Sequence, residues 1–296
     1  MGGTIALDGT QLEIAGDVII EGDRDGDGTG DVTLDAGGLS RVMRVTGGAD
    51  ATINGVNFTD GDAFSGGGLL IDGESTLMLS RAIISDNIAS SDGGGIALGA
   101  GSTLRGRDLV LKGNTAGSEG GGINVTGDAT LVNAEIADNS AIFGGGIEME
   151  DPAASLVLVN GVVHGNHAHG SGGGIDAFRG AVVVQSSTVT GNDAANLGGG
   201  LYVGDGATMT ATNSIFAGND AGVGVDAFLV EDLASGGGLI LGTAAELQNG
   251  APAPVATVAP AADLFAQIDG ATGGGLAADN GGFGRTVALK LSADNP

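Results

Sequence analysis

The sequence predicts an all-β protein, a right-handed parallel β-helix with about 24–28 residues per coil. A Gly triplet followed by Ile or Leu recurs with its third glycine at 68, 95, 122, 146, 174 and 200, and a degenerate copy follows at 224. A second motif, Asn with Ala two residues later, recurs with the same period at Asn87, Asn114, Asn139, Asn166, Asn192 and Asn219. Each period holds three short apolar segments and none of helical length, which indicates three short strands per coil.

The first strand of each coil follows the Gly triplet. Side chains alternate along a strand, so Ile147 and Met149 point inward and Glu148 points outward. If the coils stack in register, the first inward residues form one buried column of Ile96, Ile123, Ile147 and Ile175.

The second strand is a short apolar segment such as Thr76–Leu79, and the third ends just before the repeated Asn. We expect these Asn side chains to form a ladder, each amide bonding to the ones above and below. The glycines mark a turn that Cβ atoms would obstruct.

The repeat sets the organisation of the chain. We expect a β-helix over 1–246, with N-terminal coils in 1–60 and regular repeats in 61–246. Residues 247–262 are rich in Pro and Ala and predict a loop, and 263–296 predict a C-terminal coil or cap that covers the open end.

The charge limits the partners. With 36 acidic and 10 basic residues the formal net charge is −26, which disfavours nucleic acid and anionic membrane surfaces. No apolar segment is long enough to span a bilayer, and the absence of Cys excludes disulfides. The first residues show no secretion signal, so for an exported protein we expect the signal to lie outside this sequence.

The N-terminal coils contain a candidate cation loop. Asp23, Asp25, Asp27 and Asp31 alternate with Gly-rich positions in a D-x-D-x-D-G pattern. Alternate carboxylates on a tight loop suit Ca²⁺, although Leu34 stands where an EF-hand has a bidentate Glu. The alternative is an acidic surface hairpin without an ion.

A second candidate site lies in the outward column after the triplets, which we expect to contain Leu70, Ala97, Asn124, Glu148, Asp176, Tyr202 and Asp226. Glu148 and Asp176 should be one coil apart, with Glu150, Asp151 and Arg179 beside them. The alternative is that these outward positions are acidic by chance, because the whole chain is strongly acidic.

All three histidines, His164, His167 and His169, fall within six residues. They are candidate zinc ligands or, for His167, a candidate general base near Glu148 and Asp176. Because they flank a turn, their side chains can equally point apart into solvent.

The repeated GGGI…TL…I..N.A pattern resembles the β-helix repeats of bacterial secreted and surface proteins, including the polymorphic outer-membrane-protein type. The segments Asp17–Asp35, Asn213–Gly242 and Leu276–Leu289 resemble the N-terminal and terminal coils of such proteins. The resemblance implies a secreted or cell-surface location, a longer parent chain continuing past Pro296, and bound calcium. β-helix polysaccharide lyases are also similar in placing acidic residues on one sheet face, where calcium holds the substrate and an Arg or Lys abstracts a proton.

Two function classes remain open. The first is a calcium-stabilised structural or adhesive module of a larger exported protein, favoured by the even spacing of the repeats. The second is a carbohydrate-active β-helix, a lyase or epimerase acting on an acidic polysaccharide, with Arg179 as the candidate base. In either case the expected partner is an extracellular polysaccharide or a cell-surface component.

Overall fold

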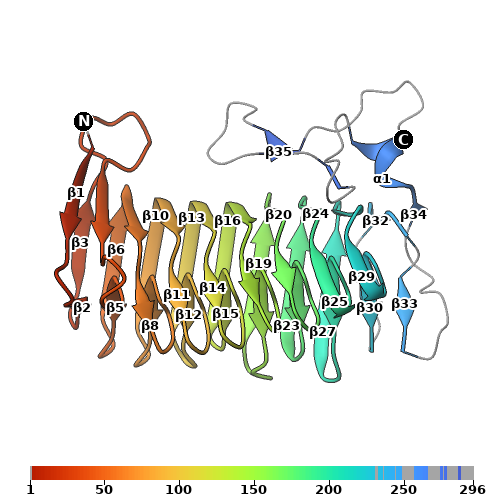
Figure 1. Cartoon of the computed structure of the whole chain (residues 1–296), viewed down its shortest axis with the longest axis horizontal. Coiled ribbons are helices and arrows are strands. Elements are labelled where there is room, and N and C mark those ends of the chain that lie inside the picture. The colour runs from red at the N-terminus through yellow and green to blue at the C-terminus, as the bar shows by residue number, and fades with distance from the viewer. Residues whose placement is uncertain are drawn as a thin grey trace.

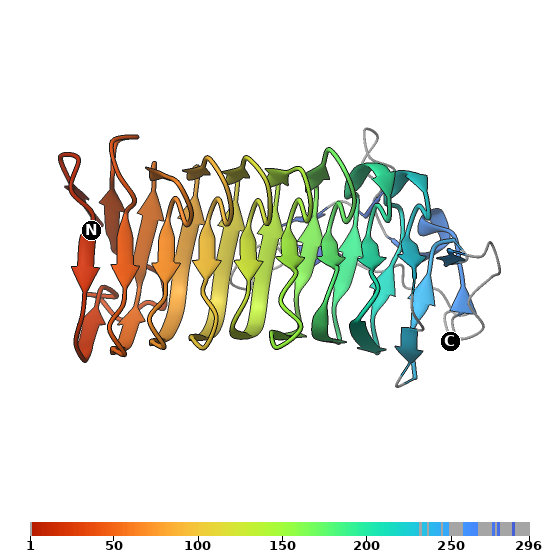
Figure 2. The same cartoon turned by 90° about the horizontal axis from the view of Figure 1, so that it is seen from below.

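The computed structural model describes residues 2–230, 233–235, 237–243, 245–248, 257–265, 274–275, 277–278 and 286–287. Figure 1 shows a solenoid in which coil after coil stacks along one axis from the N-terminal end, and Figure 2 shows the same stack from below. Almost all strand pairs among the described residues are parallel, and the only described helix is the short α1 (Ala261–Leu264). The predicted all-β parallel β-helix is confirmed.

The strands that follow the Gly triplets lie in a ten-stranded parallel sheet. Its strands are β2 (Leu12–Ile14), β5 (Met43–Val45), β9 (Leu69–Ile71), β12 (Ile96–Leu98), β15 (Ile123–Val125), β18 (Ile147–Met149), β22 (Ile175–Ala177), β26 (Leu201–Val203), β30 (Ala227–Leu229) and β33 (Glu246–Leu247). Ile96, Ile123, Ile147 and Ile175 are successive register partners and each is 0% exposed. The predicted buried column is therefore confirmed.

A seven-stranded parallel sheet lies just before the triplets. Its strands are β8 (Asp62–Ala63), β11 (Ile88–Ala89), β14 (Thr115–Ala116), β17 (Ser140–Ala141), β21 (His167–Ala168), β25 (Asp193–Leu197) and β29 (Asp220–Val223). The repeated Ala that follows each Asn points into the narrow interior here, as Ala89, Ala116, Ala141 and Ala168 are all buried.

The remaining strands of the solenoid form one bent seventeen-stranded sheet to which most coils contribute two segments. These are β1 (Gly3–Ala6), β3 (Val18–Glu21), β4 (Val32–Asp35), β6 (Asp50–Asn54), β7 (Val56–Thr59), β10 (Thr76–Ser85), β13 (Thr103–Lys112), β16 (Asp128–Ala137), β19 (Ser155–Val159), β20 (Val162–His164), β23 (Gly180–Gln185), β24 (Thr188–Thr190), β27 (Ala207–Thr212), β28 (Ile215–Phe216), β31 (Leu233–Ser235), β32 (Ile240–Leu241) and β34 (Thr257–Val258).

A single left-handed residue makes the bend in this sheet. Gly55, Arg81, Asp108 and Asn133 occupy this position on successive coils, with φ between +51° and +68°. Gly, Asn and Asp adopt this conformation most readily, whereas Arg81 adopts it at some cost. The sequence analysis did not anticipate this corner.

The predicted Asn ladder is present and buried. The backbone N–H and Nδ2 of each Asn donate to Oδ1 of the Asn on the next coil, as from Asn114 to Asn139 at 2.9 Å and 2.9 Å. The same Nδ2 also donates to a backbone carbonyl, that of Ile84 for Asn114, at 3.0 Å. The ladder thus satisfies polar groups that would otherwise be unpaired inside the coil.

The Gly triplet is required by both conformation and space. Gly93 has φ +66°, which most side chains avoid, while a Cβ on Gly94 would lie 2.5 Å from the Thr115 carbonyl oxygen. A Cβ on Gly95 would lie 2.6 Å from the Gly122 carbonyl oxygen of the next coil. Larger residues would force adjacent coils apart at this turn.

The degenerate last copy is displaced by two residues from the predicted register. Gly224, with φ +65°, takes the place of the first glycine of a triplet, and Phe228 pairs with Tyr202. The prediction that Asp226 lies in the outward column is therefore wrong. Asp226 instead ends the Asn ladder by accepting hydrogen bonds from the Asn219 backbone N–H and Nδ2 at 3.0 Å and 2.9 Å.

Half of the predicted loop 247–262 and most of the predicted cap 263–296 lie outside the described residues. Within the part that is described, β33 extends the ten-stranded sheet and β34 extends the seventeen-stranded sheet. Phe265 after α1 is buried against Ala217. Two further short strands, β35 (Ala277–Ala278) and β36 (Thr286–Val287), pair antiparallel.

Candidate functional site

A pocket of about 240 Å³ opens on the outer side of the ten-stranded sheet. It combines four acidic side chains with three aromatic rings and one serine. The lining residues are Glu119, Phe143, Glu148, Glu150, Ser171, Asp176, Phe178 and Tyr202. Two predicted candidates, Glu148 and Asp176, lie together at this site.

Glu148 and Asp176 are register partners on β18 and β22. Both point away from the apolar core, yet their exposed fractions are only 3% and 2%. Ser171 Oγ donates to Asp176 Oδ2 at 2.7 Å, whereas Glu148 Oε2 and Asp176 Oδ1 are buried without a hydrogen-bond partner. Unpaired buried carboxyl oxygens are rare in folded proteins and are costly unless the group is protonated or a ligand binds.

The environment favours the protonated acids. Burial, and then the charge of Asp176, raises the pKa of Glu148 well above its ordinary range. Burial raises the pKa of Asp176 to about 7, against the opposing effect of the Ser171 hydrogen bond. Carboxylic acids with raised pKa values in a pocket are typical of acid–base sites.

Glu119 is the third acid of the group. Burial and the neighbouring charge of Glu150 raise its pKa to about 7, while Asn124 Nδ2 donates to its Oε2 at 3.2 Å. Glu119 and Phe143 are partners in an isolated parallel bridge just before their Gly triplets. This position, directly before the triplet, supplies the pocket with Glu119, Phe143 and Ser171 on successive coils.

The aromatic side chains extend from the pocket along the sheet. Tyr202 follows Asp176 in register, and its ring stacks on Phe228 with ring centres 5.9 Å apart and planes 1° from parallel. Phe143 and Phe178 are partly exposed at the pocket. The sequence analysis placed Tyr202 in the outward column but did not identify the phenylalanine rings as part of a site.

Arg179 and the three histidines are not among the lining residues. Arg179 is exposed, with its guanidinium 5.2 Å from the centre of the Phe178 ring. His167 lies on the seven-stranded sheet, where its Nδ1 is 2.6 Å from Asp193 Oδ2. His164 is buried elsewhere, with Nε2 3.0 Å from Glu135 Oε1. The three histidines therefore do not form a single cluster.

The acidic N-terminal loop is an insertion at the left-handed corner of the seventeen-stranded sheet. Glu21 pairs with Asn54 and Val32 with Val56, so residues 22–31 occupy the place that Gly55 alone fills on the next coil. In Figure 1 this loop projects beside the N-terminus.

Three of the four predicted metal ligands converge in this loop. One carboxylate oxygen from each of Asp23, Asp25 and Asp27 lies within 4.8 Å of the others. Asp31 lies outside this group and instead accepts from the backbone N–H of Arg24 at 2.8 Å and of Asp25 at 3.3 Å. The converging oxygens fit a hard cation such as Ca²⁺, which needs further oxygens from backbone or water.

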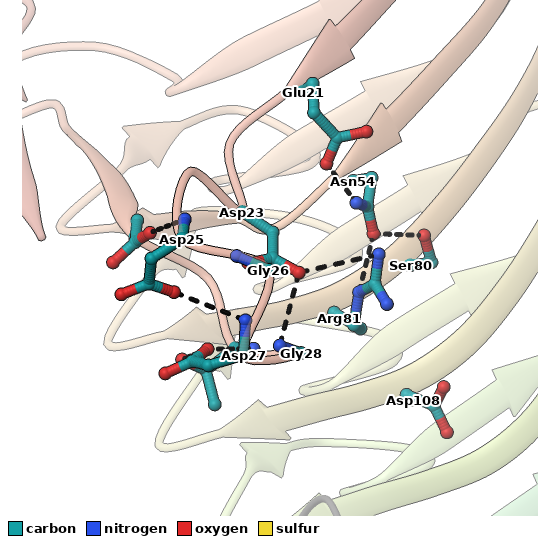
Figure 3. Close-up of polar contacts among 12 residues, drawn as sticks. Glu21, Asp23, Asp25, Gly26, Asp27, Gly28, Asn54, Ser80, Arg81 and Asp108 are labelled. Carbon is teal, nitrogen blue, oxygen red and sulfur yellow. Dashed lines mark hydrogen bonds and ion pairs between the residues drawn. The ribbon is translucent and has the colours of Figure 1, made fainter.

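The loop is fastened to the next two coils (Figure 3). Asn54 Nδ2 donates to Glu21 Oε1, and Asn54 Oδ1 accepts from Arg81 Nε at 2.9 Å. An Arg81 guanidinium nitrogen lies 3.7 Å from Asp23 Oδ2. Arg81 therefore offsets part of the negative charge of the loop.

No helix in the described part of the chain is both long and apolar enough to cross a membrane. The sequence matches the family described as the right handed beta helix region over two overlapping segments, residues 40–183 and 87–229. The chain therefore belongs to this family of right-handed parallel β-helices.

No curated protein matches the sequence. Among solved structures, the chain is similar to one described as the crystal structure of pectate lyase Pel9A. The TM-score is 0.55 with 16% sequence identity, and the match covers 99% of this chain and 80% of that one. At this sequence identity the similarity shows a shared fold and no more.

Proposed function

We propose that this protein is a carbohydrate-active β-helix that holds a sugar ring in the pocket and cleaves the adjoining glycosidic bond with Glu148 and Asp176. The observation that carries the proposal is the stacking of these two acids, each with an unpartnered buried oxygen, in a pocket that is also lined by Phe143, Phe178 and Tyr202. Aromatic rings pack against the C–H faces of sugars, and carboxyl groups bond to their hydroxyls.

The two acids suit acid–base hydrolysis. The raised pKa of Glu148 favours its protonated form, which can give its proton to the glycosidic oxygen as the bond to the leaving sugar breaks. Ionised Asp176 then takes the proton of the water that attacks the anomeric carbon, or attacks that carbon itself before water releases the sugar. Either route yields two sugar chains with one water consumed.

The charge of the pocket selects the substrate class. The lining residues include four acids and no Arg or Lys, and the whole chain has a net charge of −26. A polyuronate would be repelled, so the proposed substrate is a polysaccharide without acidic groups. This proposal replaces the acidic polysaccharide that the sequence analysis considered as the substrate.

The similarity to a pectate lyase supports polysaccharide as the ligand class but not lyase chemistry here. Proton abstraction by Arg179 would require that side chain at the substrate, and it stacks on Phe178 outside the lining residues. We therefore assign Arg179 no catalytic role.

The N-terminal loop and the location complete the proposal. Asp23, Asp25 and Asp27 bind one Ca²⁺, which fixes the loop on the first coils. The resemblance to bacterial exported repeats and the acidic surface support a secreted or cell-surface location within a larger protein. Non-catalytic adhesion through the same pocket is the second candidate, favoured by the regular stacking of the coils.

Binding tests the pocket separately from chemistry. Glu148→Gln protein is titrated by calorimetry with neutral oligosaccharides, an amino-bearing oligosaccharide and an oligogalacturonate. We expect binding of a non-acidic sugar and at least tenfold weaker binding after Tyr202→Ala. An exposed-site change, Glu74→Gln, serves as the control and should leave affinity unchanged. Exclusive binding of oligogalacturonate, or equal affinity after Tyr202→Ala, would contradict the proposed site.

A further inference from the structure

Two histidines stand side by side on the outer face of the seven-stranded sheet, apart from the pocket. His167 and His169 flank Ala168, whose side chain is buried, so both imidazoles project outward. His167 Nε2 lies 3.3 Å from His169 Nδ1, and the ring planes are 89° apart.

Asp193 fixes the orientation of His167. It is the register partner of His167 on the next coil, and its Oδ2 lies 2.6 Å from His167 Nδ1. A carboxylate in this position holds the proton on Nδ1 and leaves the lone pair on Nε2. Histidines that bind metals are commonly oriented by such a carboxylate.

We propose that His167 Nε2 and His169 Nδ1 chelate a borderline transition-metal ion, Zn²⁺ being the reference case, with Asp193 as the positioning residue. Two nitrogens bound to tetrahedral zinc at about 2.0–2.1 Å lie about 3.3–3.4 Å apart, close to the spacing found here. Water fills the other coordination positions of this exposed site. When the ion binds, the hydrogen bond between His169 Nδ1 and His167 Nε2 is lost, and the proton of His169 moves from Nδ1 to Nε2.

The ligand set distinguishes this site from the acidic loop. Imidazole nitrogens favour zinc, copper or nickel, whereas the carboxylates of Asp23, Asp25 and Asp27 favour calcium or magnesium. His164 takes no part, because it is buried against Glu135. The inference is also independent of the function proposed for the pocket.

The test is calorimetric titration with ZnCl₂ after removal of bound metals, in a protein carrying Asp25→Ala and Asp27→Ala so that the acidic loop contributes nothing. We expect one Zn²⁺ per chain. His167→Ala or His169→Ala should weaken affinity by at least tenfold, and Asp193→Asn by about 10–100-fold, as for other carboxylate–histidine pairs. Asp220→Asn, an exposed acid paired with Asp193 in register, should leave affinity within twofold.

X-ray absorption of the zinc-loaded protein identifies the ligands directly. Two imidazole ligands in the parent, and fewer after His169→Ala, would support the site. Absence of zinc uptake, or unchanged affinity in both histidine variants, would overturn it.

Discussion

Glu148 and Asp176 occupy the same position on consecutive coils, so that the stacking of the solenoid places two carboxylic acids next to each other. The repeat makes such a pair simple to build, because one acidic residue at one outward position on each coil is sufficient. Burial and the charge of Asp176 raise the pKa of Glu148, while burial and the charge of Glu119 raise the pKa of Asp176. The repeat thus creates a pair of adjacent acids whose pKa values differ from those of exposed carboxyl groups.

The pair makes stability depend on pH. Burial raises the pKa of Asp176 from 3.8 to about 7, so between these values the folded state holds a proton that the unfolded chain releases. Stability should therefore fall as pH rises from about 4 to 7. Asp176→Asn should raise the melting temperature relative to the parent more at pH 8 than at pH 4. The exposed-site change Asp220→Asn should show no such difference, and equal effects of Asp176→Asn at both pH values would contradict the assignment.

The isoleucine column should dominate local stability. Ile147→Ala removes a fully buried side chain and should lower the free energy of unfolding by about 2–5 kcal/mol, measured by chemical denaturation. Ile19→Ala is the matched control, since Ile19 is 80% exposed. Equal effects of the two changes would show that Ile147 is not in the core.

The Asn ladder should be sensitive at any inner rung. Asn139→Ala removes the acceptor of the Asn114 backbone N–H and the donor to Asn166 Oδ1. Each buried group left unpaired costs about 1–3 kcal/mol, so we expect a loss of at least about 2 kcal/mol in the same denaturation experiment. Asn196→Ala, at an exposed Asn, should cost much less. If Asn139→Ala lowered the free energy of unfolding no more than Asn196→Ala does, the ladder would contribute little to stability.

The sequence predicted the regular features because each repeats. The glycine, isoleucine and asparagine positions recur on many coils, and a wrong register would have displaced all of them together. The predicted register was wrong at the last, degenerate copy, which contains Asp226. This copy has lost two of the three glycines of the triplet. The sequence alone could not show which of two nearby glycines kept the left-handed turn.

The site was predicted in part. Alternation along the strands identified Glu148 and Asp176 as outward neighbours, but it could not show that they are buried. The pocket around them is also lined by Phe143 and Phe178, which lie outside the strands that carry the two acids. A comparison of the residues directly before each Gly triplet would have brought Glu119, Phe143 and Ser171 together.

Calcium should stabilise the N-terminal coils. If Asp23, Asp25 and Asp27 bind the ion only in the folded state, a hundredfold excess over the dissociation constant adds about 2.7 kcal/mol. A chelator should then lower the melting temperature of the parent, measured by calorimetry, but not that of the Asp25→Ala, Asp27→Ala double variant. Asp62→Asn should respond as the parent does. A double variant that still responds to the chelator would place the calcium elsewhere.

Hydrolysis is the most direct test of the central claim that Glu148 and Asp176 form an acid–base pair. Reducing ends released from non-acidic polysaccharides are measured at neutral pH with the parent, Glu148→Gln and the control Glu74→Gln. The account predicts release by the parent and the control, and a loss of at least a hundredfold in Glu148→Gln. Undiminished release by Glu148→Gln, or unsaturated products from a polyuronate as the sole activity of the parent, would contradict it.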